Sequence, residues 1–93
     1  MEEEVIRVRT PQRGELLGEV QSMSGASRFV VLCKDTKIRT CRIPGKFRKR
    51  IKISIGDLVL VIPWSIEGDA KADIEWIYTR TQANWLKKKG YWQ

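Results

Sequence analysis

The residues best suited to chemistry in this sequence form a basic run between positions 42 and 52, RIPGKFRKRIK. It holds six positive charges and no acid: Arg42, Lys46, Arg48, Lys49, Arg50 and Lys52. Lysine and arginine neutralise phosphates, and arginine can also grip a phosphate with two hydrogen bonds or stack on a base. The run therefore predicts binding of a polyanion rather than catalysis.

The composition of the whole chain points the same way. Its 93 residues include 18 Lys and Arg against 11 Asp and Glu, for a formal net charge of +7. Such an excess favours acidic partners, with nucleic acid first and an anionic membrane surface second. Many basic domains are merely soluble, so the place of these residues in the fold has to decide.

Catalytic and metal chemistry find little support. Histidine, the commonest general base, is absent. Cys33 lies in an apolar run without a base partner, and two cysteines without histidine make no zinc set. Asp69, Asp73 and Glu75 are close in sequence, but we interpret them as acids that offset nearby cations rather than as a Mg²⁺ site. Neither GxxxxGK[ST] nor GxGxxG occurs. We expect no enzyme, no cofactor and no metal.

Targeting signals are also missing from the sequence. The opening MEEEVIRV is acidic and then mixed, unlike a secretory signal. No stretch approaches the ~20 apolar residues of a membrane helix. Cys33 and Cys41 are too few for a disulfide framework. We therefore expect a cytoplasmic protein with reduced cysteines and no membrane partner.

Hydrophobic patterning predicts five short strands and a final helix. Alternating or β-rich runs give strands over about 14–23, 28–34, 37–43, 58–62 and 71–78. Pro44-Gly45 ends the third strand, and a short helical or irregular crossover follows over 46–52. The final helix is expected from an N-cap at Thr81 to about Lys89, with Gly90 just beyond it.

Five such strands favour a closed barrel, because closure removes exposed strand edges. The OB barrel has this strand count and a long connection between its third and fourth strands; an SH3-like barrel is the alternative. We expect a mobile arm at 1–12, the barrel at 13–80, and a helix and tail at 81–93 packed on the barrel. Ile38 and Cys41/Ile43 cannot share a face under strict alternation, so we expect a bulge or sharp coiling there.

The second and third strands of an OB barrel usually border its ligand surface. This would place Arg39 and Arg42 beside the basic crossover. Trp64, in the loop between the last two strands, could stack on RNA or cover the barrel end, and both roles stay open. The predicted RNA-binding residues are Arg39, Arg42, Lys46, Arg48, Lys49, Arg50, Lys52 and Trp64.

The remaining aromatic residues are expected to be structural. Phe29 and Phe47 should lie in the core or at its edge, because their side chains are apolar and carry no polar group, and Trp76 should lie in the core. The aromatic residues near the end of the chain should hold the final helix on the barrel: Trp85, Tyr91 and Trp92.

Three segments in order, GEVQSMSGASRFVV, DTKIRTCRIPGKFRKRIKISIGDLVLV and KADIEWIYT, resemble the translation initiation factor 1A family in its archaeal form. Bacterial initiation factor one is a shorter relative. The resemblance runs from Thr10 to about Leu86, and I-x-G-K-x-R-K followed by G-D-x-V-x-V is its most specific part.

The resemblance implies an S1-like OB barrel without catalysis. It implies binding to rRNA of the small ribosomal subunit at the A site, and a role with other initiation factors in initiator tRNA recruitment and start-codon selection. The family's RNA-contacting cluster maps onto Lys46, Arg48, Lys49 and Arg50, with Arg39 and Arg42 on the adjoining strand. Off the ribosome we expect a monomer.

Two other functions fit the sequence less well. A general single-stranded nucleic-acid binder or RNA chaperone would need several exposed aromatics on the second and third strands, where only Phe29 occurs. A protein-interaction adaptor of SH3-like build would need an aromatic groove with acidic residues, and the basic crossover argues against it.

Overall fold

The structure is a computed structural model that describes residues 8–25, 28–43 and 53–92. In chain order these residues form β1 (Leu16–Met23), β2 (Arg28–Cys33), β3 (Ile38–Arg42), β4 (Leu58–Pro63), β5 (Lys71–Ile77) and α1 (Arg80–Lys88). The five expected strands and the final helix are confirmed. The expected crossover helix lies outside the described residues.

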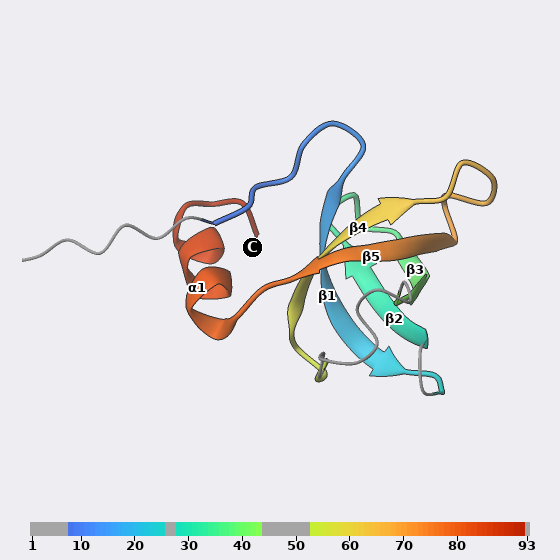
Figure 1. Cartoon of the computed structure of the whole chain (residues 1–93), viewed down its shortest axis with the longest axis horizontal. Helices are drawn as coiled ribbons and strands as arrows, with labels where there is room; N and C mark the ends of the chain where they lie inside the picture. Colours follow the sequence, from blue (N-terminus) through green and yellow to red (C-terminus); the bar gives the residue numbers. More distant parts are fainter. Residues whose placement is uncertain (1–7, 26–27, 44–52, 93) are drawn as a thin grey trace, which may run out of the picture.

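The strands close into a barrel in the order β1-β2-β3-β5-β4 (Figure 1). Neighbouring strands are antiparallel except β3 and β5, which run parallel. Every strand therefore has a hydrogen-bonded neighbour on both sides, which removes the edges of an open sheet. The helix lies at one end of the barrel, and the β4–β5 loop projects at the opposite end in Figure 1.

The bulge expected in β3 is wrong. The β2–β3 ladder runs without a register shift. Ile38 points into solvent with 60% of its surface exposed, whereas Arg39, Cys41 and Ile43 are buried. The expectation failed because it assumed that every inward position of β3 holds an apolar residue. Arg39 occupies one of these positions and is ion-paired with Asp35.

The irregular positions lie in β1 and β5 instead. Gln21 is an extra residue in β1, where the pairing with β2 shifts. Glu75 is an extra residue in β5, because Leu60 pairs with Trp76 and the next residue of β4 pairs with Ile74. Such insertions bend and twist a strand. The second one turns Trp76 outward, so its expected core position is also wrong: 38% of its surface is exposed.

The hydrophobic residues form two cores that share β4. One fills the barrel and includes Val59 and Val61. The other lies under α1 and includes Leu58 and Leu60. Phe29 is buried in the barrel, as expected. Because consecutive side chains of a strand point to opposite faces, β4 is buried on both faces, which explains why it is the most apolar strand.

The helix begins two residues earlier than expected. Its N-cap is Thr79, whose side chain accepts a hydrogen bond from the Gln82 backbone while the Gln82 side chain accepts one from the Thr79 backbone. A cap at Thr81 would put Asn84 at the reciprocal position, and glutamine or glutamate is favoured there. At the other end Gly90 has φ +86°, the left-handed conformation expected just beyond a helix.

Aromatic residues hold the end of the chain on the barrel. Trp92 is buried in the second core, as expected. Trp85 packs against the same core and stacks on Tyr91 with ring centroids 5.9 Å apart. The second core therefore closes this end of the barrel and fixes α1.

The described part of the N-terminal arm, residues 8–12, lies against the rest of the chain. Val8 packs against the second core, and the Tyr78 hydroxyl donates to the Arg9 carbonyl. The Arg9 guanidinium lies 3.0 Å from the Glu15 carboxylate and 3.6 Å from that of Glu75. Burial raises the pKa of Tyr78 to about 12, so its hydroxyl remains a donor. Mobility remains a prediction for residues 1–7, which lie outside the described residues.

In the part of the chain that the structure describes, no helix has the length and apolar character needed to cross a membrane.

Replacing Leu86 by alanine tests how firmly α1 is docked. Leu86 is fully buried in the second core, so Leu86→Ala should lower the free energy of unfolding by about 2–5 kcal/mol. The exposed neighbour Lys88 provides the control. Lys88→Ala should change the free energy of unfolding by no more than about 0.5 kcal/mol. Urea denaturation followed by circular dichroism measures both. Equal small effects would contradict a docked helix.

Candidate nucleic-acid interface

The basic crossover is fixed to the barrel at both ends. The core inside the barrel contains Ile43, which follows β3, and Ile53, which precedes β4. The five predicted contacts between them lie outside the described residues: Lys46, Arg48, Lys49, Arg50 and Lys52. The segment that carries five of the chain's positive charges and no acid thus leaves and re-enters the barrel at two buried isoleucines.

Arg42 lies on the surface where this segment begins. It is the last residue of β3, and 58% of its side chain is exposed. Its Nε lies 3.4 Å from Oδ1 of Asp73, and its guanidinium carbon lies 5.0 Å from the centre of the Trp64 ring. The structure thus brings together two predicted site residues, one on β3 and the other in the β4–β5 loop.

Arg28 is a candidate that the sequence interpretation missed. It is exposed and directly opposite Arg42 in the β2–β3 ladder. Like charges at opposed positions destabilise a sheet, and an anion bound nearby would relieve the repulsion. The sequence offered no clear signal for this pairing, because counting outward from a two-residue turn at Asp35-Thr36 would pair Arg28 with Ile43. In the structure the Cys33 N–H donates to the Lys37 carbonyl, so the turn has three residues and the partner of Arg28 is Arg42.

Trp64 forms part of a groove wall. Its indole Nε1–H donates to Asp73 Oδ1 at 2.9 Å, and the Lys71 ammonium lies 5.5 Å from its ring centre. These contacts hold a half-buried ring in one orientation. An open groove of about 530 Å³ lies beside it, lined by Arg42, Ile62, Pro63, Trp64, Ser65, Ile66 and Asp73. A groove with an aromatic wall and an arginine could take a base or a sugar-phosphate segment.

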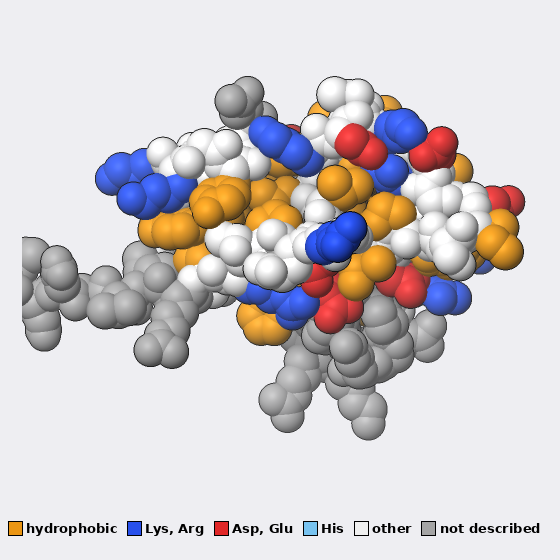
Figure 2. Space-filling model, turned by 90° about the horizontal axis from the view of Figure 1, so that it is seen from above, with side chains coloured by type: hydrophobic (Ala, Val, Ile, Leu, Met, Phe, Trp, Pro, Cys, Tyr) orange, Lys and Arg blue, Asp and Glu red, His pale blue; other side chains and the backbone are white. Residues whose placement is uncertain are grey.

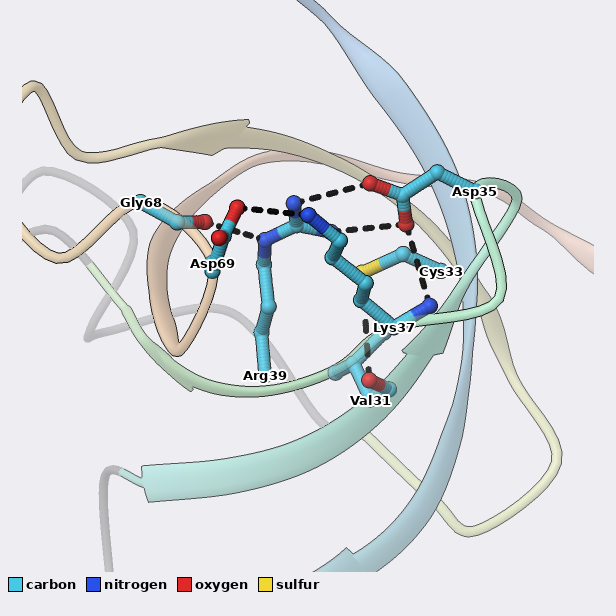
Figure 3. A network of polar contacts seen from close by, with 7 residues as sticks. All are labelled: Val31, Cys33, Asp35, Lys37, Arg39, Gly68 and Asp69. Atoms are coloured by element: carbon cyan, nitrogen blue, oxygen red, sulfur yellow. Dashed lines mark hydrogen bonds and ion pairs between the residues drawn. The ribbon is translucent and has the colours of Figure 1, made fainter.

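Arg39 is buried rather than displayed. Only 3% of its surface is exposed. Its Nη1 and Nη2 donate to the two carboxylate oxygens of Asp35 at 2.9 Å each, and its Nε donates to the Gly68 carbonyl at 2.5 Å (Figure 3). The hydrogen bonds from Arg39 lower the pKa of Asp35, and those to Asp35 raise the pKa of Arg39. We therefore leave Arg39 out of the proposed contact surface. Its sequence position beside Arg42 did not reveal that its strand face points inward.

Acids and bases neighbour one another over the described surface. Figure 2 shows Asp and Glu side chains beside Lys and Arg side chains on one face of the molecule. Lys37 Nζ lies 2.7 Å from Asp69 Oδ1, and Lys71 Nζ lies 3.5 Å from Glu67 Oε1. Asp69 and Asp73 thus each face a cation, which agrees with their interpretation as charge-balancing acids. In the sequence, positive charge without a neighbouring acid occurs in the crossover and again around the final helix, at Arg80, Lys87, Lys88 and Lys89.

The two thiols are buried and unreactive. Burial raises the pKa of Cys33, and it raises that of Cys41 to about 12. Because the thiolate is the nucleophile, neither cysteine is suited to covalent catalysis at neutral pH.

Comparison with known proteins decides the family. The sequence matches the family model described as translation initiation factor 1A / IF-1 over residues 4–93. The chain belongs to this family. The translation initiation factor 1A of Methanothermobacter thermautotrophicus is 55% identical over 89 residues, which cover 96% of this chain and 90% of the relative. That of Archaeoglobus fulgidus is 54% identical over 92 residues, covering 97% and 94%. The chain is therefore a translation initiation factor and not an enzyme.

Solved structures confirm the OB barrel. The translation initiation factor one of the Wolbachia endosymbiont of Brugia malayi has a TM-score of 0.56 and 30% identity, covering 72% of this chain and 79% of that one. YjeQ from Thermotoga maritima has a TM-score of 0.59 and 28% identity, covering 71% of this chain but only 23% of that one. The second likeness is confined to one barrel in a longer protein.

The Asp35–Arg39 pair should make the free energy of unfolding depend on pH in the acidic range. Because the pKa of Asp35 is lower in the folded than in the unfolded chain, its contribution is present above the unfolded pKa of about 3.9 and is lost as pH falls through the folded pKa. The free energy of unfolding should therefore decline below about pH 5. Asp35→Asn/Arg39→Met, which keeps the net charge, should show a shallower decline in urea titrations between pH 7 and pH 2.

The exposed ion pair of the same loops gives the control. Asp69→Asn removes the partner of Lys37, and exposed pairs contribute little to stability, so the acid decline should stay close to that of the wild type. If the free energy of unfolding of Asp35→Asn/Arg39→Met falls as steeply with decreasing pH as that of the wild type, carboxylates other than Asp35 cause the effect.

Proposed function

We propose that this initiation factor binds rRNA of the small ribosomal subunit at the A site. Through that contact it would promote initiator tRNA recruitment and start-codon selection together with other initiation factors. The observation that carries the proposal is the basic segment 44–52 of the family's barrel, set between the buried residues Ile43 and Ile53.

Electrostatics supplies the physical basis. Each phosphate that Lys or Arg neutralises releases condensed counterions, which drives binding and makes it depend on salt. Fixed segment ends lower the conformational entropy that the segment loses on binding. Arg42 and Arg28 extend the positive surface from the start of the segment onto β3 and β2. Lys46, Arg48, Lys49, Arg50 and Lys52 are the proposed principal contacts.

The β2 and β3 strands favour a structured rRNA site over general single-strand binding. Both strands lie wholly within the described residues, and their one aromatic side chain, Phe29, is buried in the barrel. A sequence-tolerant single-strand binder stacks successive bases on exposed aromatic rings. These two strands offer it no such ring.

The protein is proposed to act as a cytoplasmic monomer off the ribosome. Barrel closure supports this state, because each of the five described strands has a hydrogen-bonded neighbour on both sides over at least part of its length, which shortens the edges that could pair with another copy.

Co-sedimentation with purified subunits tests the proposed function. The protein should pellet with small but not large ribosomal subunits at moderate salt, and the association should weaken steeply as salt is raised. Equal retention by both subunits would favour general nucleic-acid binding, and no retention by small subunits at moderate salt would sink the proposal.

The basic segment can be tested by removing two arginines. Arg48→Ala/Arg50→Ala should weaken small-subunit binding and reduce the slope of log K against log salt by about 0.7–0.9 per lost phosphate contact. Thermal unfolding should stay nearly unchanged. Lys88→Ala/Lys89→Ala removes the same charge near the end of α1 and should leave most of the binding intact. A large fall in melting temperature for the arginine variant would make those residues structural instead.

A further inference from the structure

Two loops far apart in the sequence are joined by side-chain contacts. The turn between β2 and β3 carries Asp35 and Lys37, and the β4–β5 loop carries Gly68 and Asp69. Arg39, on β3, donates to the Gly68 carbonyl, and Lys37 donates to the Asp69 carboxylate (Figure 3). Only one of these two links is buried: Arg39 is enclosed, whereas about half of the Lys37 side chain is exposed.

Arg39 is suited to fix a loop because each of its three guanidinium nitrogens donates a hydrogen bond. Both terminal nitrogens donate to Asp35, and Nε donates to Gly68. The planar guanidinium presents these donors in fixed directions, so the loop carbonyl is held relative to the Asp35 carboxylate. Lysine could not satisfy the same three acceptors in this geometry.

Gly68 lies between Arg39 and Trp64, because its carbonyl accepts from Arg39 and its Cα lies close to the Trp64 backbone. A Cβ added to Gly68 would clash with the Trp64 carbonyl oxygen and lie 3.4 Å from Pro63 Cβ. The loop therefore folds back tightly on the residue that carries the indole. Within it, the Glu67 carbonyl accepts from the backbone N–H groups of Ala70 and Lys71 at 3.0 and 2.8 Å. A shift of Gly68 must therefore displace Trp64 or break these turn contacts.

The outer wall of the groove depends on where Trp64 lies. Its indole N–H reaches Asp73, and Asp73 also faces Arg42. The groove beside them is open, and its other walls come from the same loop and from the end of β4. The chain of contacts thus runs from buried Arg39 through Gly68 and Trp64 to surface Arg42.

We propose that Arg39 is a positioning residue for nucleic-acid recognition. From inside the barrel it holds the β4–β5 loop so that Trp64 and Arg42 present the groove to the sugar-phosphate backbone or bases of RNA. Arg39 itself touches no RNA. This proposal rests on the proposed function for its ligand, but its structural half, the link from Arg39 to Trp64, can be tested in the free protein.

Indole NMR tests that link without RNA. The protein contains four tryptophans, so ¹⁵N-labelled indole groups give four signals, and Trp64→Phe assigns the one of interest. Gly68→Ala and Asp35→Asn/Arg39→Met should both shift the Trp64 signal, whereas those of Trp85 and Trp92 should stay in place. Lys37→Gln is the matched control, because it breaks the exposed link between the same loops and should leave Trp64 nearly unmoved.

Salt-dependent binding separates positioning from contact. Asp35→Asn/Arg39→Met should bind small subunits roughly three- to thirty-fold more weakly, the range expected of a residue that acts through another. Its slope of log K against log salt should equal that of Gly68→Ala, because a positioning residue makes no phosphate contact of its own. Arg42→Gln should instead reduce the slope by about 0.7–0.9. Gly68→Ala, which changes no charge, should reproduce the weakening of the double variant.

The outcomes are distinguishable. Wild-type protein that fails to bind small subunits contradicts the proposed function, while the indole signals still report the link. If the wild type binds, either of two results would overturn the positioning role. In the first, Gly68→Ala and Asp35→Asn/Arg39→Met bind small subunits as tightly as the wild type does. In the second, they leave the Trp64 signal at its wild-type position. A salt slope reduced for Asp35→Asn/Arg39→Met but not for Gly68→Ala also overturns the positioning role, because Arg39 would then be a direct phosphate contact.

Discussion

The structure depends on the burial of β4 on both faces. Val59 and Val61 fill the barrel, while Leu58 and Leu60 form the floor on which α1 and Trp92 pack. A chain of this size buries a modest core, so one strand that serves two cores gains much of the available apolar burial. It also ties barrel closure to helix docking, because β4 pairs with both β1 and β5.

Charged residues are distributed differently between the described barrel and the basic segment 44–52. On the described barrel, carboxylates stand within reach of cations, as at Arg9–Glu15, Lys37–Asp69 and Arg42–Asp73. Exposed pairs of this kind add little stability, but they reduce the local positive potential. The five positive charges of segment 44–52 have no acid among them in sequence. Five of the chain's 18 Lys and Arg therefore lie in one short segment whose flanking residues, Ile43 and Ile53, are buried in the core.

Arg39 shows why a basic residue near a basic cluster need not belong to the binding surface. Its strand face turns inward, and Asp35 four residues earlier supplies a carboxylate that matches the guanidinium. A buried charge is tolerated only with such partners. The consequence is a buried link between two loops rather than another cation on the surface.

Local signals along the chain were enough to predict the five strands, the closed barrel and the resemblance to the family. Runs of β-branched and apolar residues, punctuated by glycine, proline and turn residues, are local signals, and all five strands appear where those signals lie. The sequence also located the basic crossover, because charge density is read directly from composition. The C-terminal helix was predicted too, but its N-cap is Thr79 and not the predicted Thr81, because Thr79 and Gln82 form reciprocal hydrogen bonds.

The direction in which particular side chains point could not be predicted from local signals, because it depends on contacts between distant parts of the chain. The extra residue Glu75 reverses the alternation of β5 and turns Trp76 outward, and no local pattern signals that insertion. The inward turn of Arg39 depends on Gly68, 29 residues away, as well as on Asp35. The pairing of Arg28 with Arg42 likewise depends on register. Side-chain direction in a small barrel is set by pairing between distant strands, so sequence patterns place the elements, and closure assigns each residue its face.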